Sequence, residues 1–185
     1  GIYNKKDHIL LLVVDEQPRL MNALENGENT VLNTITLIEA SQKYQIPVLA
    51  TEQYPKGLGN TDERILAKLD KNNIYEKTIF DAATAEVLDF IEKNNIKKVV
   101  IAGAEAHICV YQTTRSLLNL GINVFLPKDA LASFKENQKE EALKTLREMG
   151  AVRTETETLL FDLARDSKDP NFKFISGLIK DMRDR

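Results

Sequence analysis

The amino-acid sequence predicts an α/β fold of three layers, in which helices cover both faces of a parallel sheet of five or six strands. Short runs rich in β-branched apolar residues alternate with longer segments whose apolar residues recur at helical spacing, and this alternation is typical of a parallel sheet. With 185 residues, of which 43% are hydrophobic, the chain is long enough to enclose one core. We therefore expect a single domain over residues 1–185.

The predicted strands are the short apolar runs that separate the helical segments. Each run is too short and too uniformly apolar to be a strand that exposes one face to water. In chain order the strands are Ile9–Val14, Pro47–Thr51, Ile74–Lys77, Lys98–Ala102 and Ile122–Leu126, with a short sixth strand around Ala151–Arg153.

The predicted helices lie between these strands and have recognisable ends. The first stops before Pro47, because the residue that precedes a proline avoids the helical conformation. Beyond Pro170, apolar residues follow at helical spacing, and we expect this last helix to bury one face on its own domain; a contact with a second subunit is the alternative. The helices are marked by Val31, Ile35 and Ile38; by a start at Thr61 with Ile65, Leu66 and Leu69; by Val87, Phe90 and Ile91; by the segments from about His107 to Gly121 and from Asn137 to Gly150; and by Phe172, Ile175, Ile179 and Met182.

Composition excludes several classes of partner. The formal net charge is only -3 with 29% charged residues, so the basic surface that nucleic-acid binding needs is not expected. The longest apolar run, Ile9–Val14, is far shorter than the roughly 20 residues that span a membrane, and no leader-like segment opens the sequence. A single cysteine, Cys109, fits a reducing compartment. We expect a cytoplasmic protein that contacts neither nucleic acid nor membrane.

Reactive side chains follow three of the predicted strands. Asp15 follows the first strand, Lys77 ends the third, and Cys109 lies after the fourth. Because ligands bind outside the carboxyl ends of parallel strands, we expect these residues to share one edge of the sheet. Of the two histidines, His8 and His107, the second lies two residues from the cysteine and would not face it on a helix. Asp15 is therefore the expected general base.

Cys109 lies where a helix begins, and a helix start favours an anion, so we expect a lowered thiol pKa. Lys77 stands among apolar and aromatic residues, where pairing with Asp15 would satisfy its ammonium and favour the thiolate. Each residue alone has an ordinary alternative. A cysteine often fills core space, an aspartate can cap a strand end, and a lysine can extend to solvent.

Four motifs in the right order carry a family resemblance over nearly the whole chain. They are LLVVDEQ at Leu11–Gln17, TEQYPKGLG at Thr51–Gly59, EKTIFDA at Glu76–Ala82 and GAEAHICV at Gly103–Val110. With these motifs the sequence resembles the isochorismatase-like cysteine hydrolases, and within them the branch of isochorismatase domain-containing proteins.

The resemblance implies a Rossmann-like fold and a catalytic triad of Asp15, Lys77 and Cys109. It also implies a cis peptide bond between Ala104 and Glu105, and an oxyanion hole formed by the backbone amides of Glu105 and Cys109. The reaction implied is hydrolysis of a small carboxamide or carbamoyl C–N bond through a thioester. Relatives of this kind usually form dimers or larger homo-oligomers.

The resemblance also directs attention to the substrate pocket. Nicotinamidase-type relatives bind a metal through an Asp-x-His motif, whereas this chain has Thr51-Glu52-Gln53, so we expect no catalytic metal and no cofactor. The segment Glu52 to Gly59 is expected to line the pocket, with a small molecule as the partner. The candidate substrate-binding residues are Gln17, Gln53, Tyr54, Leu58, Phe80 and His107.

Three other functions remain open from the sequence. A binding or scaffold protein could retain the same pocket without catalysis. A redox sensor could oxidise Cys109 reversibly, although a second, resolving cysteine is lacking. A nucleotide-binding module is less compatible, because no glycine-rich phosphate cradle follows the first strand.

Overall fold

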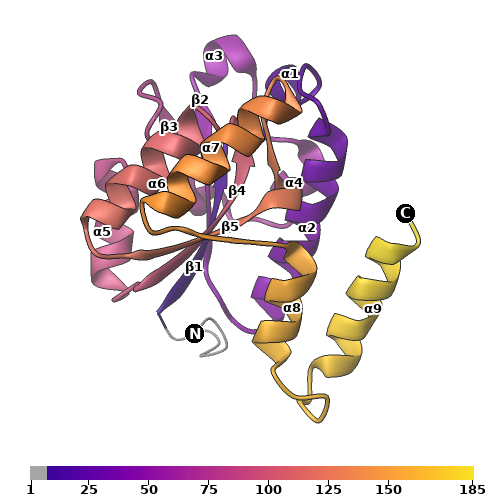
Figure 1. Ribbon diagram of the computed structural model, residues 1–185. Coiled ribbons are helices and arrows are strands. Elements are labelled where there is room, and N and C mark those ends of the chain that lie inside the picture. Colours follow the sequence, from indigo (N-terminus) through magenta and orange to yellow (C-terminus); the bar gives the residue numbers. More distant parts are fainter. Residues whose placement is uncertain (1–7) are drawn as a thin grey trace.

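A parallel sheet runs through the middle of the molecule, of which the computed structural model describes residues 8–185 (Figure 1). The strands follow the order β3-β2-β1-β4-β5-β7, and β6 pairs with β4 beside this path. Every strand pair in this part of the chain is parallel, as the predicted fold class requires. The strands are β1 (Ile9–Val14), β2 (Val48–Gln53), β3 (Ile74–Lys77), β4 (Lys98–Ala104), β5 (Asn123–Pro127), β6 (Leu131–Ala132) and β7 (Val152–Thr154).

The sheet has seven strands, so the predicted number of five or six is too low. Strand β6 is only two residues long, and so short a strand leaves no apolar run that could reveal it. Strand β2 also continues past Thr51 to Gln53, two residues beyond its predicted end. This extension carries Glu52 and Gln53 as strand residues to the carboxyl edge of the sheet.

Strand β1 lies at the centre of the sheet, and its side chains fill two separate cores. Ile9, Leu11 and Val13 belong to one buried cluster, and the alternate residues Leu10, Leu12 and Val14 belong to the other. Successive side chains of a strand point to opposite faces. A continuous apolar run is therefore what a strand covered on both faces needs.

Helices cover both faces of this sheet (Figure 1). One core contains residues of α2, α8 and α9, and the other contains residues of α5, α6 and α7. The helices are α1 (Pro18–Met21), α2 (Gly27–Lys43), α3 (Pro55–Leu58), α4 (Glu63–Leu66), α5 (Ala85–Lys93), α6 (Cys109–Asn119), α7 (Glu136–Glu148), α8 (Thr156–Ala164) and α9 (Phe172–Arg183), with single 3-10 turns at Lys71–Asn73 and Lys128–Ala130.

Most predicted helices are present, with shifted ends. Helix α4 starts at Glu63 rather than Thr61, because Asp62 caps it by accepting a hydrogen bond from the Arg64 amide. Helix α8 is not predicted by the sequence. Helix α9 buries Ile175 in the core of its own domain. This is the arrangement that the sequence predicts for the segment, with contact to a second subunit as the alternative. Within residues 8–185, no helix has the length and apolar character needed to cross a membrane.

Candidate active site

The three reactive residues meet at the carboxyl edge of the sheet. Asp15 follows β1, Lys77 ends β3, and Cys109 is the first residue of α6. The Nζ atom of Lys77 donates a hydrogen bond to Oδ2 of Asp15 at 2.8 Å and lies 3.6 Å from Sγ of Cys109. All three side chains are buried. The fold thus brings together an acid, an ammonium and a thiol from three distant parts of the sequence.

A close approach of two strand ends makes this meeting possible. Asp15 has a φ of 55°, a left-handed conformation that aspartate tolerates better than most residues. Strand β4 passes directly beside this turn at Gly103, which has a φ of 126°. A Cβ atom on Gly103 would lie 2.1 Å from the carbonyl oxygen of Val14. Glycine is therefore required where the loop toward Cys109 leaves the sheet.

Lys77 is a buried ammonium surrounded by acceptors. Its side chain is only 1% exposed, which excludes the alternative of a lysine that extends to solvent. An ammonium has three protons to donate, and more acceptors than that lie within reach of Nζ. These are Oδ2 of Asp15 at 2.8 Å, Oε1 of Gln53 at 2.6 Å, the carbonyl oxygens of Ile79 at 3.2 Å and Phe80 at 2.9 Å, and Sγ of Cys109 at 3.6 Å.

The pKa of Cys109 differs from the sequence-based expectation. Burial, followed by the negative charge of Asp15, raises the pKa of the thiol from 9.0 to about 12. Lys77 acts in the opposite direction but does not compensate. The predicted lowering of the pKa by the helix start is therefore wrong, because desolvation of the thiolate is the largest influence on this group. The resting group is a protonated thiol beside a carboxylate.

The loop before Cys109 has an unusual backbone. The peptide bond between Ala104 and Glu105 is cis. The carbonyl oxygen of Glu105 accepts hydrogen bonds from the amides of Ile108 and Val110, both at 3.1 Å. Among residues 8–185, the amide N–H groups of Glu105 and Cys109 donate no backbone hydrogen bond.

Two glutamines of the predicted substrate pocket have other partners. The side-chain amide of Gln17 donates to the carbonyl oxygens of Gln53 at 2.9 Å and Gly59 at 2.8 Å, and its oxygen accepts from the Gln53 amide at 2.8 Å. Gln17 therefore has no free proton for a substrate, and we reassign it to supporting the loop that ends at Gly59. Gln53 likewise uses its side chain within the protein, as an acceptor from Lys77 and a donor to the carbonyl oxygen of Thr78 at 2.7 Å.

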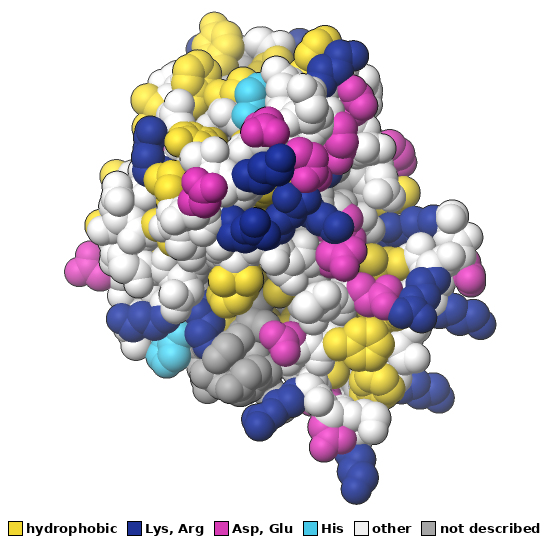
Figure 2. Space-filling model, in the orientation of Figure 1, with side chains coloured by type: hydrophobic (Ala, Val, Ile, Leu, Met, Phe, Trp, Pro, Cys, Tyr) yellow, Lys and Arg dark blue, Asp and Glu magenta, His cyan; other side chains and the backbone are white. Residues whose placement is uncertain are grey.

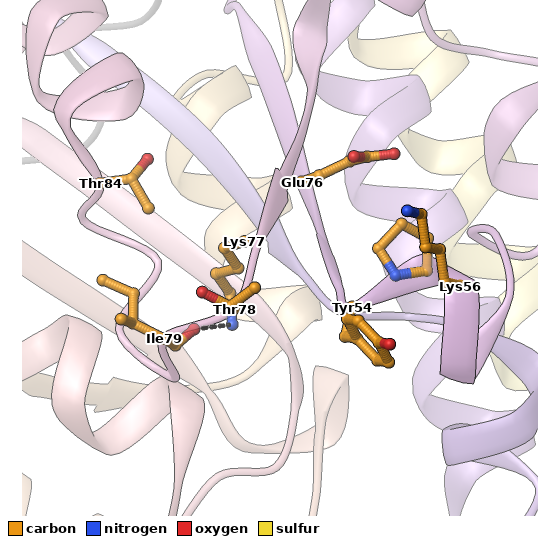
Figure 3. A pocket seen from close by; sticks show the side chains of 8 residues that line it. Tyr54, Lys56, Glu76, Lys77, Thr78, Ile79 and Thr84 are labelled. Carbon is orange, nitrogen blue, oxygen red and sulfur yellow. Dashed lines mark hydrogen bonds between the residues drawn. The ribbon is translucent and has the colours of Figure 1, made fainter.

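The other pocket candidates divide between two hollows. Tyr54 lines a cavity of about 580 Å³ together with Lys77 and Thr84. Figure 3 shows this cavity, with the amine of Lys77 turned toward the carbonyl oxygen of Ile79. His107 instead lines a separate hollow of about 370 Å³ beside α6 and α7, and its Nδ1 lies 2.9 Å from Oγ of Ser133. The larger cavity borders Lys77 but not Cys109.

Exposed apolar side chains surround this edge of the sheet. Tyr54, Ile79, Phe80 and Phe134 are all more than half exposed, and Leu58 is partly buried. Apolar side chains gather at the top of Figure 2, the end at which the strands of Figure 1 finish. On the face shown, acidic and basic side chains are intermixed. Phe80 is one of these exposed residues, and its carbonyl oxygen accepts a hydrogen bond from Lys77.

Three further residues make hydrogen bonds at the site or close to it that the sequence motifs do not reveal. Thr51 donates a hydrogen bond to Oδ1 of Asp15 at 2.8 Å. One turn after Cys109, Thr113 donates to the Cys109 carbonyl oxygen at 2.6 Å and accepts from the amide of Ala82 at 2.7 Å. Glu52 accepts two hydrogen bonds from Thr61, both at 2.7 Å.

These contacts bear on metal binding. The segment Thr51-Glu52-Gln53 corresponds to the expected position of a metal motif, and all three side chains already bind other residues. Among the residues described, no three or more histidine, cysteine, aspartate or glutamate side chains form a group that could hold a metal ion. The donor set of this segment does not fit a metal, and we derive no step through one.

Comparison with known proteins places the chain in a family. Residues 9–158 match the family described as the isochorismatase domain. The chain belongs to the isochorismatase family. Isochorismatase family protein 1A of Dictyostelium discoideum is 36% identical over 180 residues, covering 95% of this chain and 87% of that protein. Members of the isochorismatase family are hydrolases.

Two solved structures share the isochorismatase fold. The MAR1 ribonuclease from Caenorhabditis elegans superposes with a TM-score of 0.90 at 33% identity, covering 95% of this chain and 91% of that one. The YcaC gene product of Escherichia coli, described as an octameric hydrolase of unknown specificity, superposes with a TM-score of 0.88 at 21% identity, covering 97% and 92%. The second likeness concerns the fold alone.

Proposed function

We propose that this isochorismatase-family hydrolase is a cysteine hydrolase, which cleaves a small carboxamide or carbamoyl C–N bond through a thioester intermediate. The observation that carries the proposal is the buried cluster in which Lys77 Nζ lies 2.8 Å from Asp15 and 3.6 Å from Cys109. A nucleophile beside a base, with a third group that orients the base, is the arrangement that covalent catalysis needs.

Attack on the substrate requires removal of the thiol proton. As Sγ of Cys109 forms a bond to the carbonyl carbon, the proton passes to the carboxylate of Asp15, and the carbonyl π electrons move to oxygen. The oxyanion is stabilised by the amides of Glu105 and Cys109. The ammonium of Lys77 stabilises the negative charge that develops on sulfur as the proton leaves. Because the pKa of Cys109 is raised to about 12, proton transfer accompanies the attack.

Breakdown of the adduct regenerates the enzyme in two stages. The C–N bond breaks, Asp15 returns its proton to the nitrogen, and ammonia or an amine leaves while the acyl group remains on Cys109. Asp15 then takes a proton from water, whose oxygen attacks the thioester. The C–S bond breaks, the proton returns to sulfur, and a carboxylic or carbamic acid is released.

Steady-state hydrolysis tests this proposal. A panel of small carboxamides and carbamoyl compounds is incubated with wild-type protein, Cys109→Ala and Asp15→Asn, and release of ammonia is measured. We expect release by the wild type and loss of at least about a thousandfold in Cys109→Ala. Release that persists in Cys109→Ala contradicts the proposal.

The described activity of the C. elegans relative provides a competing outcome. In parallel, single-stranded RNA is incubated with the same three proteins at low salt. Cleavage of RNA by both wild type and Cys109→Ala, without amide hydrolysis by either, would identify a phosphodiesterase site elsewhere. The net charge of -3 and the buried thiol favour the small-molecule substrate.

We propose further that the protein is a cytoplasmic homo-oligomer, whose single domain binds no nucleic acid. The exposed side chains of Tyr54, Ile79, Phe80 and Phe134 support an apolar contact between subunits, and the related E. coli protein is described as octameric. Light scattering of the purified protein measures the assembly state. A monomer at micromolar concentration contradicts this part of the proposal.

A further inference from the structure

We propose that Thr51 and Gln53 of strand β2 are positioning residues, each of which holds one charged member of the Asp15–Lys77 pair in place. The inference rests on the proposed cysteine hydrolysis. It replaces the predicted role of Gln53 as a substrate ligand with a role inside the protein. It also gives a role to Thr51, which the sequence places in a strand and a motif without a function of its own.

The position of β2 in the sheet makes both contacts possible. Strand β2 lies between β1 and β3. Thr51 pairs with Val14, the residue before Asp15, and Gln53 pairs with Lys77 itself. Side chains two residues apart on a strand point to the same face. One strand therefore presents two polar groups to the charged residues of its two neighbours.

Thr51 holds the carboxylate of Asp15. Its hydroxyl donates to Oδ1 at 2.8 Å, while Lys77 donates to Oδ2 at 2.8 Å. The Asp15 amide also donates to the Thr51 carbonyl oxygen at 3.1 Å. With both oxygens bound, the carboxylate cannot rotate freely, and its orientation toward the thiol is maintained.

Gln53 holds the ammonium of Lys77. Its Oε1 accepts from Nζ at 2.6 Å, and its Nε2 donates to the carbonyl oxygen of Thr78 at 2.7 Å. The backbone amide of Gln53 donates to Oε1 of Gln17 at 2.8 Å. A neutral amide orients the ammonium without cancelling its charge, as a carboxylate at this position would. The charge of Lys77 therefore remains available to Asp15 and to the sulfur.

The first test measures the thiol and does not depend on hydrolysis. Alkylation of Cys109 by iodoacetamide is followed by intact-protein mass spectrometry from pH 7 to pH 10 in wild type, Gln53→Met and Gln53→Glu. Lys77 lowers the pKa of Cys109, so an ammonium that is loosened or neutralised should slow alkylation at pH 8 by about tenfold for each pKa unit. We expect both variants to be slower than wild type, with profiles displaced to higher pH.

The second test measures turnover of a carboxamide substrate. We expect Thr51→Val to lower kcat about tenfold with little change in KM, because the loss affects orientation and not binding, and Thr51→Ser to restore kcat. Thr36→Val, whose hydroxyl donates to the Leu32 carbonyl oxygen in α2, makes the same chemical change away from the site and should leave kcat unchanged.

The two tests separate this inference from the proposed function. If wild-type protein hydrolyses no amide, the proposed function fails, and alkylation alone still decides the role of Gln53. If Gln53→Met and Gln53→Glu fold with the wild-type melting temperature and are alkylated within twofold of the wild-type rate across the pH range, Gln53 does not position Lys77. Turnover by folded Thr51→Val within twofold of the wild type overturns the role of Thr51.

Discussion

Replacement of Asp15 by asparagine should change alkylation and hydrolysis in opposite directions. Asparagine keeps the size of the side chain but removes the negative charge that raises the pKa of Cys109. The thiolate then becomes easier to form, and a reagent such as iodoacetamide, which needs only a thiolate, should react faster. Hydrolysis of an amide also needs a base that accepts and returns protons, so turnover should be lost.

The magnitude follows from the pKa shift. The pKa of Cys109 rises from 9.0 to about 12, and each pKa unit changes the thiolate fraction tenfold. At pH 8 the protein therefore carries about a thousandfold less thiolate than an ordinary cysteine. Burial is the largest cause and is unchanged in Asp15→Asn, whereas the charge of Asp15 is the second cause. Loss of that charge should raise the alkylation rate constant at pH 8 by about tenfold for each unit by which the thiol pKa falls. The increase should stay below the thousandfold of the whole shift, because burial remains.

The assay compares alkylation rate constants at several pH values, measured by intact mass. Lys77→Met should react more slowly than wild type, because the ammonium lowers the pKa of the thiol. Asp162→Asn, on the exposed side of α8, removes an equal charge far from the thiol and should react like wild type. A folded Asp15→Asn protein that is alkylated no faster than wild type would refute the electrostatic reasoning.

Three further changes test the packing and burial of individual residues in the fold. Gly103→Ala should lower the free energy of unfolding by about 2 kcal/mol or more, because the added Cβ would lie 2.1 Å from the Val14 carbonyl oxygen. Gly121→Ala is the control, since Gly121 has a φ of 80° with nothing within 4 Å of the added Cβ, and its free energy of unfolding, measured in urea, should fall less. Equal losses in the two variants would contradict the clash. Burial raises the pKa of Glu16 well above its usual range, so the folded protein keeps this proton at a pH at which the unfolded chain loses it. The free energy of unfolding of the wild type should therefore fall relative to that of Glu16→Gln as pH rises above about 4.5. If the two free energies of unfolding differ by the same amount at pH 5 and pH 8, Glu16 is not a buried neutral acid. Ile175→Ala should cost about 2 to 5 kcal/mol, since Ile175 is fully buried, and a much smaller loss would mean that α9 does not pack on its own domain.

The parts of the fold that the sequence reveals are those with a local signal. The apolar run of β1 is readable because both of its faces contact core residues. Strand β6 pairs Leu131 with Gly103 of β4 and is too short to carry a pattern. Helix α8 begins directly after Glu155, whose side chain makes no capping hydrogen bond. Because glutamate is not among the usual helix-capping residues, the sequence gives no clear signal for the position at which this helix begins.

For the site, too, the sequence predicts the features that have a local signal and not those that depend on distant contacts. Residues that follow parallel strands are expected at one edge of the sheet, and this rule predicts that Asp15, Lys77 and Cys109 lie together. The direction of the thiol pKa could not be predicted, because it depends on how completely other segments bury Cys109. The partners of Gln17 and Gln53 also depend on contacts between distant segments, the first of them spanning 36 positions of the chain. Such contacts leave no trace in local sequence patterns.

Capture of an acyl group on Cys109 tests the account most directly. Wild-type protein is mixed with a substrate from the carboxamide panel, quenched in acid within one turnover, digested and analysed by mass spectrometry. The account predicts that the peptide containing Cys109 gains the mass of the acyl group, that hydroxylamine removes this mass, and that Cys109→Ala shows no gain. Product formation at the wild-type rate without any acyl group on that peptide, in a quench fast enough to detect it, would contradict covalent catalysis by Cys109.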